Sequence, residues 1–163
     1  MNLLDRLLRH DAWTTGQLLT ICESLEAADL DYDFDIGHRS LRRTFDHIIW
    51  NMEVWSALMA GAEIDRNRDC DVTALRSRLN TAAKQLAQVA RNVAKNNTWD
   101  ETWLDHLDNP PSRKSYGTAI AHVLTHSMHH RAQILHMLRR AGVTPPEGDV
   151  FSWERESGEK AAQ

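Results

Sequence analysis

The amino-acid sequence predicts an all-α fold, a four-helix bundle with a long crossover before the last helix, from three observations. Apolar residues recur at helical spacing in four long segments. No segment of similar length alternates apolar and polar residues as a half-buried strand does. The chain has 163 residues and a mass of 18.7 kDa, which is the size of one ordinary domain. We therefore expect a single domain over residues 1–163, with a tail from about residue 151 that is expected to be flexible.

The first two predicted helices flank an acidic connection. The first runs from about Asn2 to Ala27, where leucines recur on one face. The stretch DLDYDFDIG that follows is acidic and ends in glycine, a pattern typical of a surface connection. The second helix spans about Ser40 to Ala60, with Ser40 as its expected N-cap and Gly61 as its stop.

The third predicted helix begins at Asp71 or Thr73 and continues to about Val93. Its polar face carries Arg, Lys, Gln and Asn, which indicates a purely structural helix. The four helices are expected to share one core, to which they contribute Leu7, Ile48, Leu79 and Ile134 in chain order.

The long crossover occupies about Asn96 to Ser115, where turn-forming residues and two prolines interrupt the helical pattern. A short extended segment is expected around Thr102 to Leu107. The last helix spans about Tyr116 to Ala141 and is stopped by Gly142.

Composition narrows the class of protein. The net charge of −4 gives no basic field of the kind that attracts a phosphate backbone, so no nucleic-acid partner is expected. Charges at Asp5, Arg6, Arg9 and Asp11 interrupt the apolar residues near the start, and no long apolar run follows, so neither a signal peptide nor a membrane span is expected. We therefore predict a cytoplasmic protein. Two cysteines, Cys22 and Cys70, are too few for a disulfide framework or a cysteine zinc site.

Histidine provides the strongest chemical signal, because the chain has nine and five of them lie in the last predicted helix. At about 100° per residue, His130 falls within the apolar arc of that helix and His126 at its edge. An i, i+4 pair can chelate one metal ion but leaves further ligands to another segment. His47 lies on the inner arc of the second helix and can supply one. Spacing alone leaves two interpretations open, a metal site and a set of hydrogen-bonded core histidines.

Two stretches resemble the DinB/YfiT-like family of bacterial four-helix-bundle metalloproteins: His47 in DHIIWN, and HVLTHSMHHRAQILHMLRRAGVTPPEGD downstream. The most specific part is a histidine, three residues, a His-Arg pair, and then a glycine, two prolines and an aspartate. The resemblance covers nearly the whole chain. It implies zinc or nickel held by three histidines, here His47, His126 and His130, with water in an open position. Ala132 stands where the family often has glycine, a change between small residues that we expect to leave the site intact.

Three neighbouring residues are candidates for supporting roles. Arg131 lies near the centre of the apolar arc, so we expect it to be buried beside a carboxylate, with Asp149 or Glu53 as partners. Asp11 lies among the leucines of the first helix; it either accepts a hydrogen bond from a ligand imidazole or occupies a shallow position at the end of the bundle. Asn51, one turn after His47, either contacts metal-bound water or substrate or simply faces the cavity.

The predicted function follows from three neutral ligands and an open coordination position, which favour an enzyme that acts on a small-molecule substrate. The resemblance implies thiol-dependent transferases, in which the metal activates the sulfur of a low-molecular-weight thiol. A metal-dependent hydrolase is the alternative enzyme, although no glutamate lies within the turn from His126 to His130. A non-catalytic metal-binding stress-response protein is the alternative outside enzymes. Trp13 and Trp50 fall outside the apolar arcs of their helices and favour a homodimer.

Overall fold

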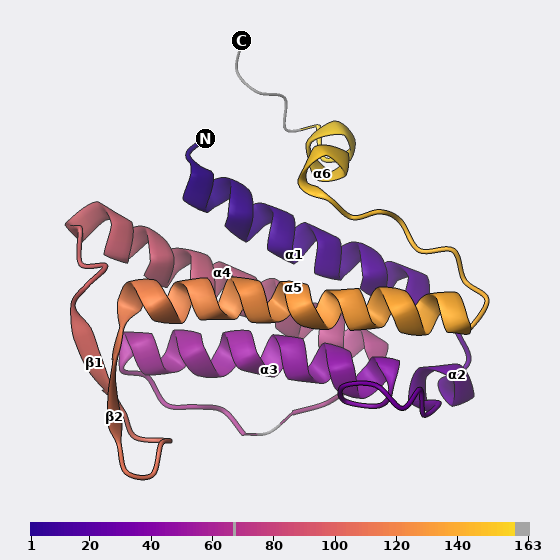
Figure 1. Cartoon of the computed structure of the whole chain (residues 1–163), viewed down its shortest axis with the longest axis horizontal. Coiled ribbons are helices and arrows are strands. Elements are labelled where there is room, and N and C mark those ends of the chain that lie inside the picture. The colour runs from indigo at the N-terminus through magenta and orange to yellow at the C-terminus, as the bar shows by residue number, and fades with distance from the viewer. Residues whose placement is uncertain (67, 159–163) are drawn as a thin grey trace.

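The computed structural model describes residues 1–66 and 68–158, and these form a four-helix bundle (Figure 1). The predicted all-α fold class is confirmed. The long helices are α1 (Leu3–Cys22), α3 (Leu41–Ala60), α4 (Val72–Asn96) and α5 (Tyr116–Arg140). Two short helices, α2 (Ala27–Asp31) and α6 (Val150–Glu156), and two short strands, β1 (Thr102–Asp105) and β2 (Ser112–Ser115), complete the described elements.

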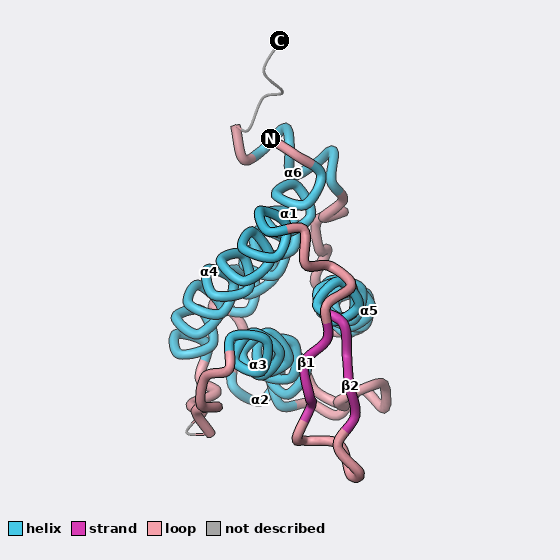
Figure 2. Tube along the Cα trace, turned by 90° about the vertical axis from the view of Figure 1, so that its left-hand side faces the viewer, coloured by secondary structure: helices cyan, strands magenta, loops and turns pink. Residues whose placement is uncertain are grey.

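The long helices are arranged in a ring around one apolar core. Helix α3 packs against α4 and α5, and α1 packs against the same two helices, so α1 and α3 lie at opposite corners. Figure 2 shows this arrangement in a view in which α3 and α5 are seen nearly end on. Side chains from all four long helices, among them Leu18, Ile49, Leu86 and Ile134, are buried in the core cluster.

The helix ends follow the predicted capping chemistry. The Ser40 hydroxyl accepts a hydrogen bond from the backbone N–H of Arg43 at the start of α3, and the Asp71 carboxylate accepts one from Ala74 at the start of α4. Helix α3 ends at Gly61, which adopts the left-handed conformation with φ of +64°.

The first third of the chain differs from prediction in two respects. Helix α1 ends at Cys22, and the acidic stretch is more than a surface connection, because it includes the end of α2 and places Leu30 and Phe34 in the core. Leu7 is 41% exposed, so its predicted core position is wrong; Leu8 is the buried residue of that turn. Ile48, Leu79 and Ile134 are buried as predicted.

The crossover forms an antiparallel hairpin before α5. Strand β1 lies within the predicted extended segment and pairs with β2 in a register that sets Thr102 opposite Ser115 and Trp103 opposite Lys114. Because β2 leads directly into α5, the hairpin is fixed at the N-terminal end of that helix (Figure 1).

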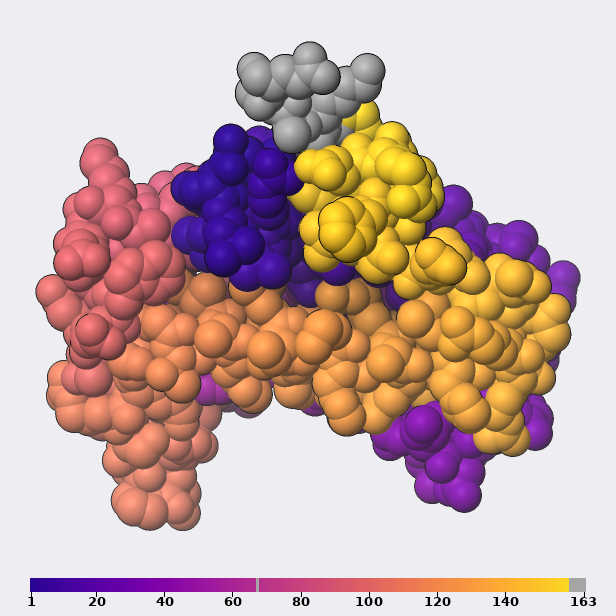
Figure 3. All heavy atoms as spheres, turned by 45° about the horizontal axis from the view of Figure 1, so that its top comes forward, coloured from indigo at the N-terminus to yellow at the C-terminus, as the bar shows by residue number. Residues whose placement is uncertain are grey.

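The C-terminal segment packs against α1 at the surface shown in Figure 3. We expected a flexible tail from about residue 151, whereas residues 150–156 form α6 and its Trp153 is buried beside the His10 ring. The Arg6 guanidinium also lies 2.8 Å from the Glu154 carboxylate. The part of the expected tail at residues 159–163 lies outside the described residues. Among the described helices, none is both long and apolar enough to cross a bilayer.

Candidate metal centre

The three predicted ligands come together between α3 and α5. His126 Nε2 lies 3.1 Å from His47 Nε2 and 3.2 Å from His130 Nε2. Two nitrogens of a tetrahedral zinc site are roughly 3.3 Å apart, because each Zn–N bond is about 2.0–2.1 Å long. A neutral imidazole has one N–H, so the His126 Nε2 atom cannot donate to both neighbours at once. The spacing and the excess of nitrogen lone pairs both fit a shared cation.

A fourth histidine, His38, also belongs to this cluster, and sequence reasoning missed it. Its ring stacks on that of His47 with centroids 3.7 Å apart, and it lies 5.1 Å from the His130 ring. His38, His47 and His130 each offer a nitrogen within 4.8 Å of the others. Two sets of three histidines could therefore bind one ion. Both sets include His47 and His130, and the third member is either His126 or His38. His38 lies in the loop before α3, where no helical periodicity could assign it a face.

Gln133 fixes the orientation of one ligand ring. The Nδ1–H of His130 donates to the Gln133 Oε1 atom at 2.8 Å, which leaves the lone pair on Nε2 directed at the cluster. The amide nitrogen of Gln133 lies 3.1 Å from His129 Nε2. Gln133 therefore supports the site from one turn further along α5.

Burial keeps the clustered imidazoles neutral. Desolvation, followed by the proximity of the other histidines, lowers the pKa of His47 and that of His126 to about 4. Desolvation also lowers the pKa of His130 and of His38. A metal ion requires neutral imidazole ligands, so near neutral pH the cluster is ready to bind one without first losing protons.

Arg131 is buried beside a carboxylate as predicted, but the partner is different. Its guanidinium forms an ion pair with Asp11 and donates to the Ser127 hydroxyl at 3.0 Å. The proposed partners have other roles: Asp149 caps α6, and Glu53 pairs with Arg78 at 2.8 Å.

The pairing also corrects the predicted roles of Asp11. Asp11 is 3% exposed, so it does not occupy a shallow position, and its contacts are with Arg131 rather than with a ligand imidazole. The physical reason is the direction in which side chains leave α5. Arg131 of α5 contacts Asp11 of α1, whereas His126 of α5 lies against His47 of α3. In the described part of the chain, the Nδ1 atom of His126 is buried and has no hydrogen-bond partner.

Asn51, Trp13 and Trp50 are all partly buried. The Oδ1 atom of Asn51 is buried and has no hydrogen-bond partner among the described residues, which suits a role towards a bound molecule. Trp13 and Trp50 are half-buried rather than exposed, and the Arg68 guanidinium lies 4.3 Å from the centroid of the Trp50 ring. The observation behind the predicted homodimer is therefore weaker, and the homodimer stays a prediction.

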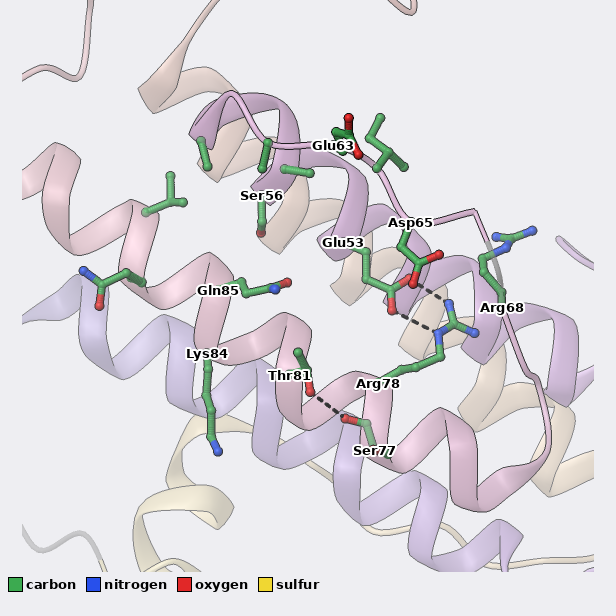
Figure 4. A pocket seen from close by; sticks show the side chains of 16 residues that line it. Glu53, Ser56, Glu63, Asp65, Arg68, Ser77, Arg78, Thr81, Lys84 and Gln85 are labelled. Atoms are coloured by element: carbon green, nitrogen blue, oxygen red, sulfur yellow. Dashed lines mark hydrogen bonds and ion pairs between the residues drawn. The ribbon is translucent and has the colours of Figure 1, made fainter.

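A cavity of about 670 Å³ lies away from the histidines, between α3, α4 and the loop that joins them (Figure 4). Its inner wall includes Glu53 and Arg78, which form an ion pair, and Arg78 also pairs with Asp46. No histidine lines this cavity. Its size alone therefore does not make it a site for the chemistry that the histidine cluster can support.

The fold and the cluster together define a helical-bundle protein whose grouped histidines fit a metal-binding site. The sequence model of the DinB family matches residues 1–161, and the chain belongs to the DinB family. No curated protein matches the chain in sequence.

Proposed function

We propose that this protein is a metal-dependent enzyme that holds one divalent ion, zinc or nickel, with His47, His126 and His130. The observation that carries the proposal is the approach of two other Nε2 atoms to within 3.2 Å of His126 Nε2. These side chains come from two helices separated by the whole of α4, so the cluster is a product of the fold.

The chemistry we propose is activation of a low-molecular-weight thiol for transfer to a small-molecule substrate. A divalent ion held by neutral nitrogen ligands acidifies a thiol or a water molecule. The chain's own residues supply the support: Gln133 orients His130, and burial keeps His47 and His126 neutral. The unpartnered Oδ1 atom of Asn51 is available to accept a hydrogen bond from a bound molecule. Hydrolysis by the same centre is the second enzyme function.

One observation favours the non-catalytic alternative. His38 lies against His47, and as a fourth ligand it would close the coordination sphere in the way that structural sites do. Two other residues that could close the sphere have different partners, because Asp11 pairs with Arg131 and His129 contacts Gln133. The role of His38 therefore separates a catalytic site from a storage or stress-response site.

Metal analysis of protein purified without a histidine tag tests the ligand assignment. We expect about one equivalent of metal in the wild type and a loss of at least tenfold in affinity in each of His47→Ala, His126→Ala and His130→Ala. His136→Ala is the matched control, because His136 is exposed on the same helix. If metal content survives His126→Ala but is lost in His38→Ala, the ligand set is instead His38, His47 and His130.

An activity screen tests the chemistry separately. Metal-loaded protein is incubated with several low-molecular-weight thiols and a panel of electrophiles, and thioether products are measured by mass spectrometry. Product that disappears in His47→Ala supports thiol transfer. Hydrolysis of ester or amide substrates without any need for thiol would support the hydrolase instead.

A further inference from the structure

Helices α3 and α5 run antiparallel and face each other along two lines of polar and aromatic side chains. Residues at intervals of four lie on one face of a helix. The line on α3 consists of His47, Asn51 and Trp55, and the line on α5 consists of His130, His126 and His122. The metal centre occupies only one end of these lines, so the remaining residues need another explanation.

Aromatic rings continue from the metal centre to the hairpin. The His122 ring lies 5.2 Å from the ring of His126 and 5.2 Å from that of Trp55. The Trp103 ring of β1 meets Trp55 edge to face, with centroids 5.9 Å apart. His122 is exposed and Trp55 is half-buried, so solvent reaches this end of the lines.

Three polar atoms along this path are buried and lack partners within the described residues: His126 Nδ1, Asn51 Oδ1 and Trp103 Nε1. Beyond the metal centre these include one acceptor, Asn51 Oδ1, and one donor, Trp103 Nε1. Buried polar groups are almost always hydrogen-bonded in folded proteins, because leaving one unpaired is costly. A bound molecule that donates to Asn51 and accepts from Trp103 would satisfy both.

The charges at the hairpin decide which molecules this region favours. The Lys114 ammonium lies 5.7 Å from the Trp55 ring, but it is held by Asp105 at 3.1 Å and by Asp108 at 2.5 Å. Two carboxylates face one ammonium, so the group carries a net negative charge and disfavours an anion. Tryptophan faces attract flat rings and cations.

We infer that Asn51, Trp55, Trp103 and His122 bind the organic part of the substrate, and that this part is a flat aromatic group that is neutral or cationic and carries an N–H or O–H donor. The inference rests on the proposed function for its position beside the metal centre. The contacts that would recognise the ring come from α3, α5 and β1, and none of them requires the metal.

Binding of matched probes tests the inference in the full chain. Benzamide, benzamidine and benzoate share a ring and differ in charge, and cyclohexanecarboxamide lacks the aromatic ring. Binding is followed by intrinsic tryptophan fluorescence and by NMR shifts of the indole N–H groups, with and without zinc. In the zinc-free protein, where a carboxylate has no ion to bind, we expect benzamide and benzamidine to bind about tenfold more tightly than benzoate or cyclohexanecarboxamide, with the Trp103 indole N–H among the signals that move.

Variants of Trp55 and His122 test whether the probes bind at the proposed site. Trp55→Leu is expected to weaken benzamide about tenfold, and His122→Ala, which alters an exposed residue, serves as a second variant if Trp55→Leu does not fold. Trp13→Leu on α1 is the control and should bind benzamide like the wild type. In the zinc-free protein, benzoate binding as tight as that of benzamide, or benzamide binding unchanged in both site variants, would overturn the inference. A wild type that binds zinc but no probe overturns it and leaves the metal centre intact, whereas probe binding without zinc binding supports it and contradicts the proposed function.

Discussion

At the scale of single residues, Arg131 and Asp11 form a buried ion pair in which each charge depends on the other. Arg131 is 5% exposed and Asp11 is 3% exposed, so neither charge can turn to solvent if its partner is removed. We predict that Asp11→Leu lowers the free energy of unfolding by about 3–5 kcal/mol, because it leaves a guanidinium buried without its counter-ion. Urea denaturation followed by circular dichroism measures the change.

The double variant Asp11→Leu, Arg131→Met is the control for that prediction. With both charges gone, much of the lost stability should return, because apolar residues of similar volume often replace a buried ion pair without loss. A double variant no more stable than Asp11→Leu would show that packing, and not the unpaired charge, causes the effect.

Gln133 gives a second prediction at this scale. Gln133→Leu removes the acceptor for His130 Nδ1–H, so the ring is free to rotate or to change tautomer. We expect zinc affinity to fall by about 10- to 100-fold while helical content is unchanged. Competition with a chelator of known affinity measures the change. Gln85→Leu, on the exposed surface of α4, should bind zinc like the wild type.

Most of the residues that the sequence analysis placed on long helices were placed correctly, because helical periodicity fixes their direction; Leu7 is an exception. Helical periodicity predicted that Arg131 is buried. It also predicted that His126 and His130 face the interior of the bundle, where they meet His47. It could not identify Asp11 as the partner of Arg131, because that contact depends on which face of α1 meets α5. It also missed His38, whose position depends on how a loop folds over α5.

At the scale of elements, the loop over residues 32–40 supports the histidine cluster. Phe34 is buried, and its carbonyl accepts a hydrogen bond from the Arg140 guanidinium at 2.7 Å. Gly37 has φ of +52° and lies so close to Gln133 that an added Cβ would be 2.1 Å from its Oε1 atom. This contact holds the loop against the residue that orients His130, and it brings His38 onto His47.

We therefore predict that Gly37→Ala weakens zinc binding as well as the fold. The left-handed backbone alone should cost about 1 kcal/mol, and displacement of Gln133 should lower zinc affinity about tenfold or more. Gly61→Ala separates the two effects, because Gly61 has φ of +64° but nothing within 4 Å of an added Cβ. Gly61→Ala should lose only stability. Equal zinc affinity in the two variants would contradict the role assigned to the loop.

Long helices with their caps were predictable at this scale, and short elements were not. Ser40, Asp71 and Gly61 mark helix ends through local chemistry that a sequence displays directly. Helices α2 and α6 have 5 and 7 residues, too few for a helical period to be recognised. They are held by tertiary burial of Leu30 and Trp153, which depends on the rest of the fold.

At the scale of the whole molecule, the apolar core and the histidine cluster are separate parts of the bundle. The core cluster includes residues of all four long helices, whereas the clustered histidines come only from α3, α5 and the loop before α3. A chain of this size can bury enough apolar surface to fold without a metal ion. The metal should therefore add to the stability of a bundle that is already folded.

We predict that removing metal with a chelator leaves the helical circular dichroism spectrum intact and lowers only the melting temperature. A ligand that binds the folded state alone stabilises it by about 2.7 kcal/mol when its free concentration is 100 times Kd, which corresponds to roughly 5–11 °C for a domain of this size. The stabilisation should therefore grow as zinc is added back. His126→Ala should show the spectrum of the metal-free protein and a melting temperature that zinc does not raise. This variant lacks the Nε2 atom that lies within 3.2 Å of both His47 Nε2 and His130 Nε2, so the proposed ligand set is incomplete. Loss of helical structure on chelation would mean that the ion, and not the packing of four apolar helix faces, holds the bundle together.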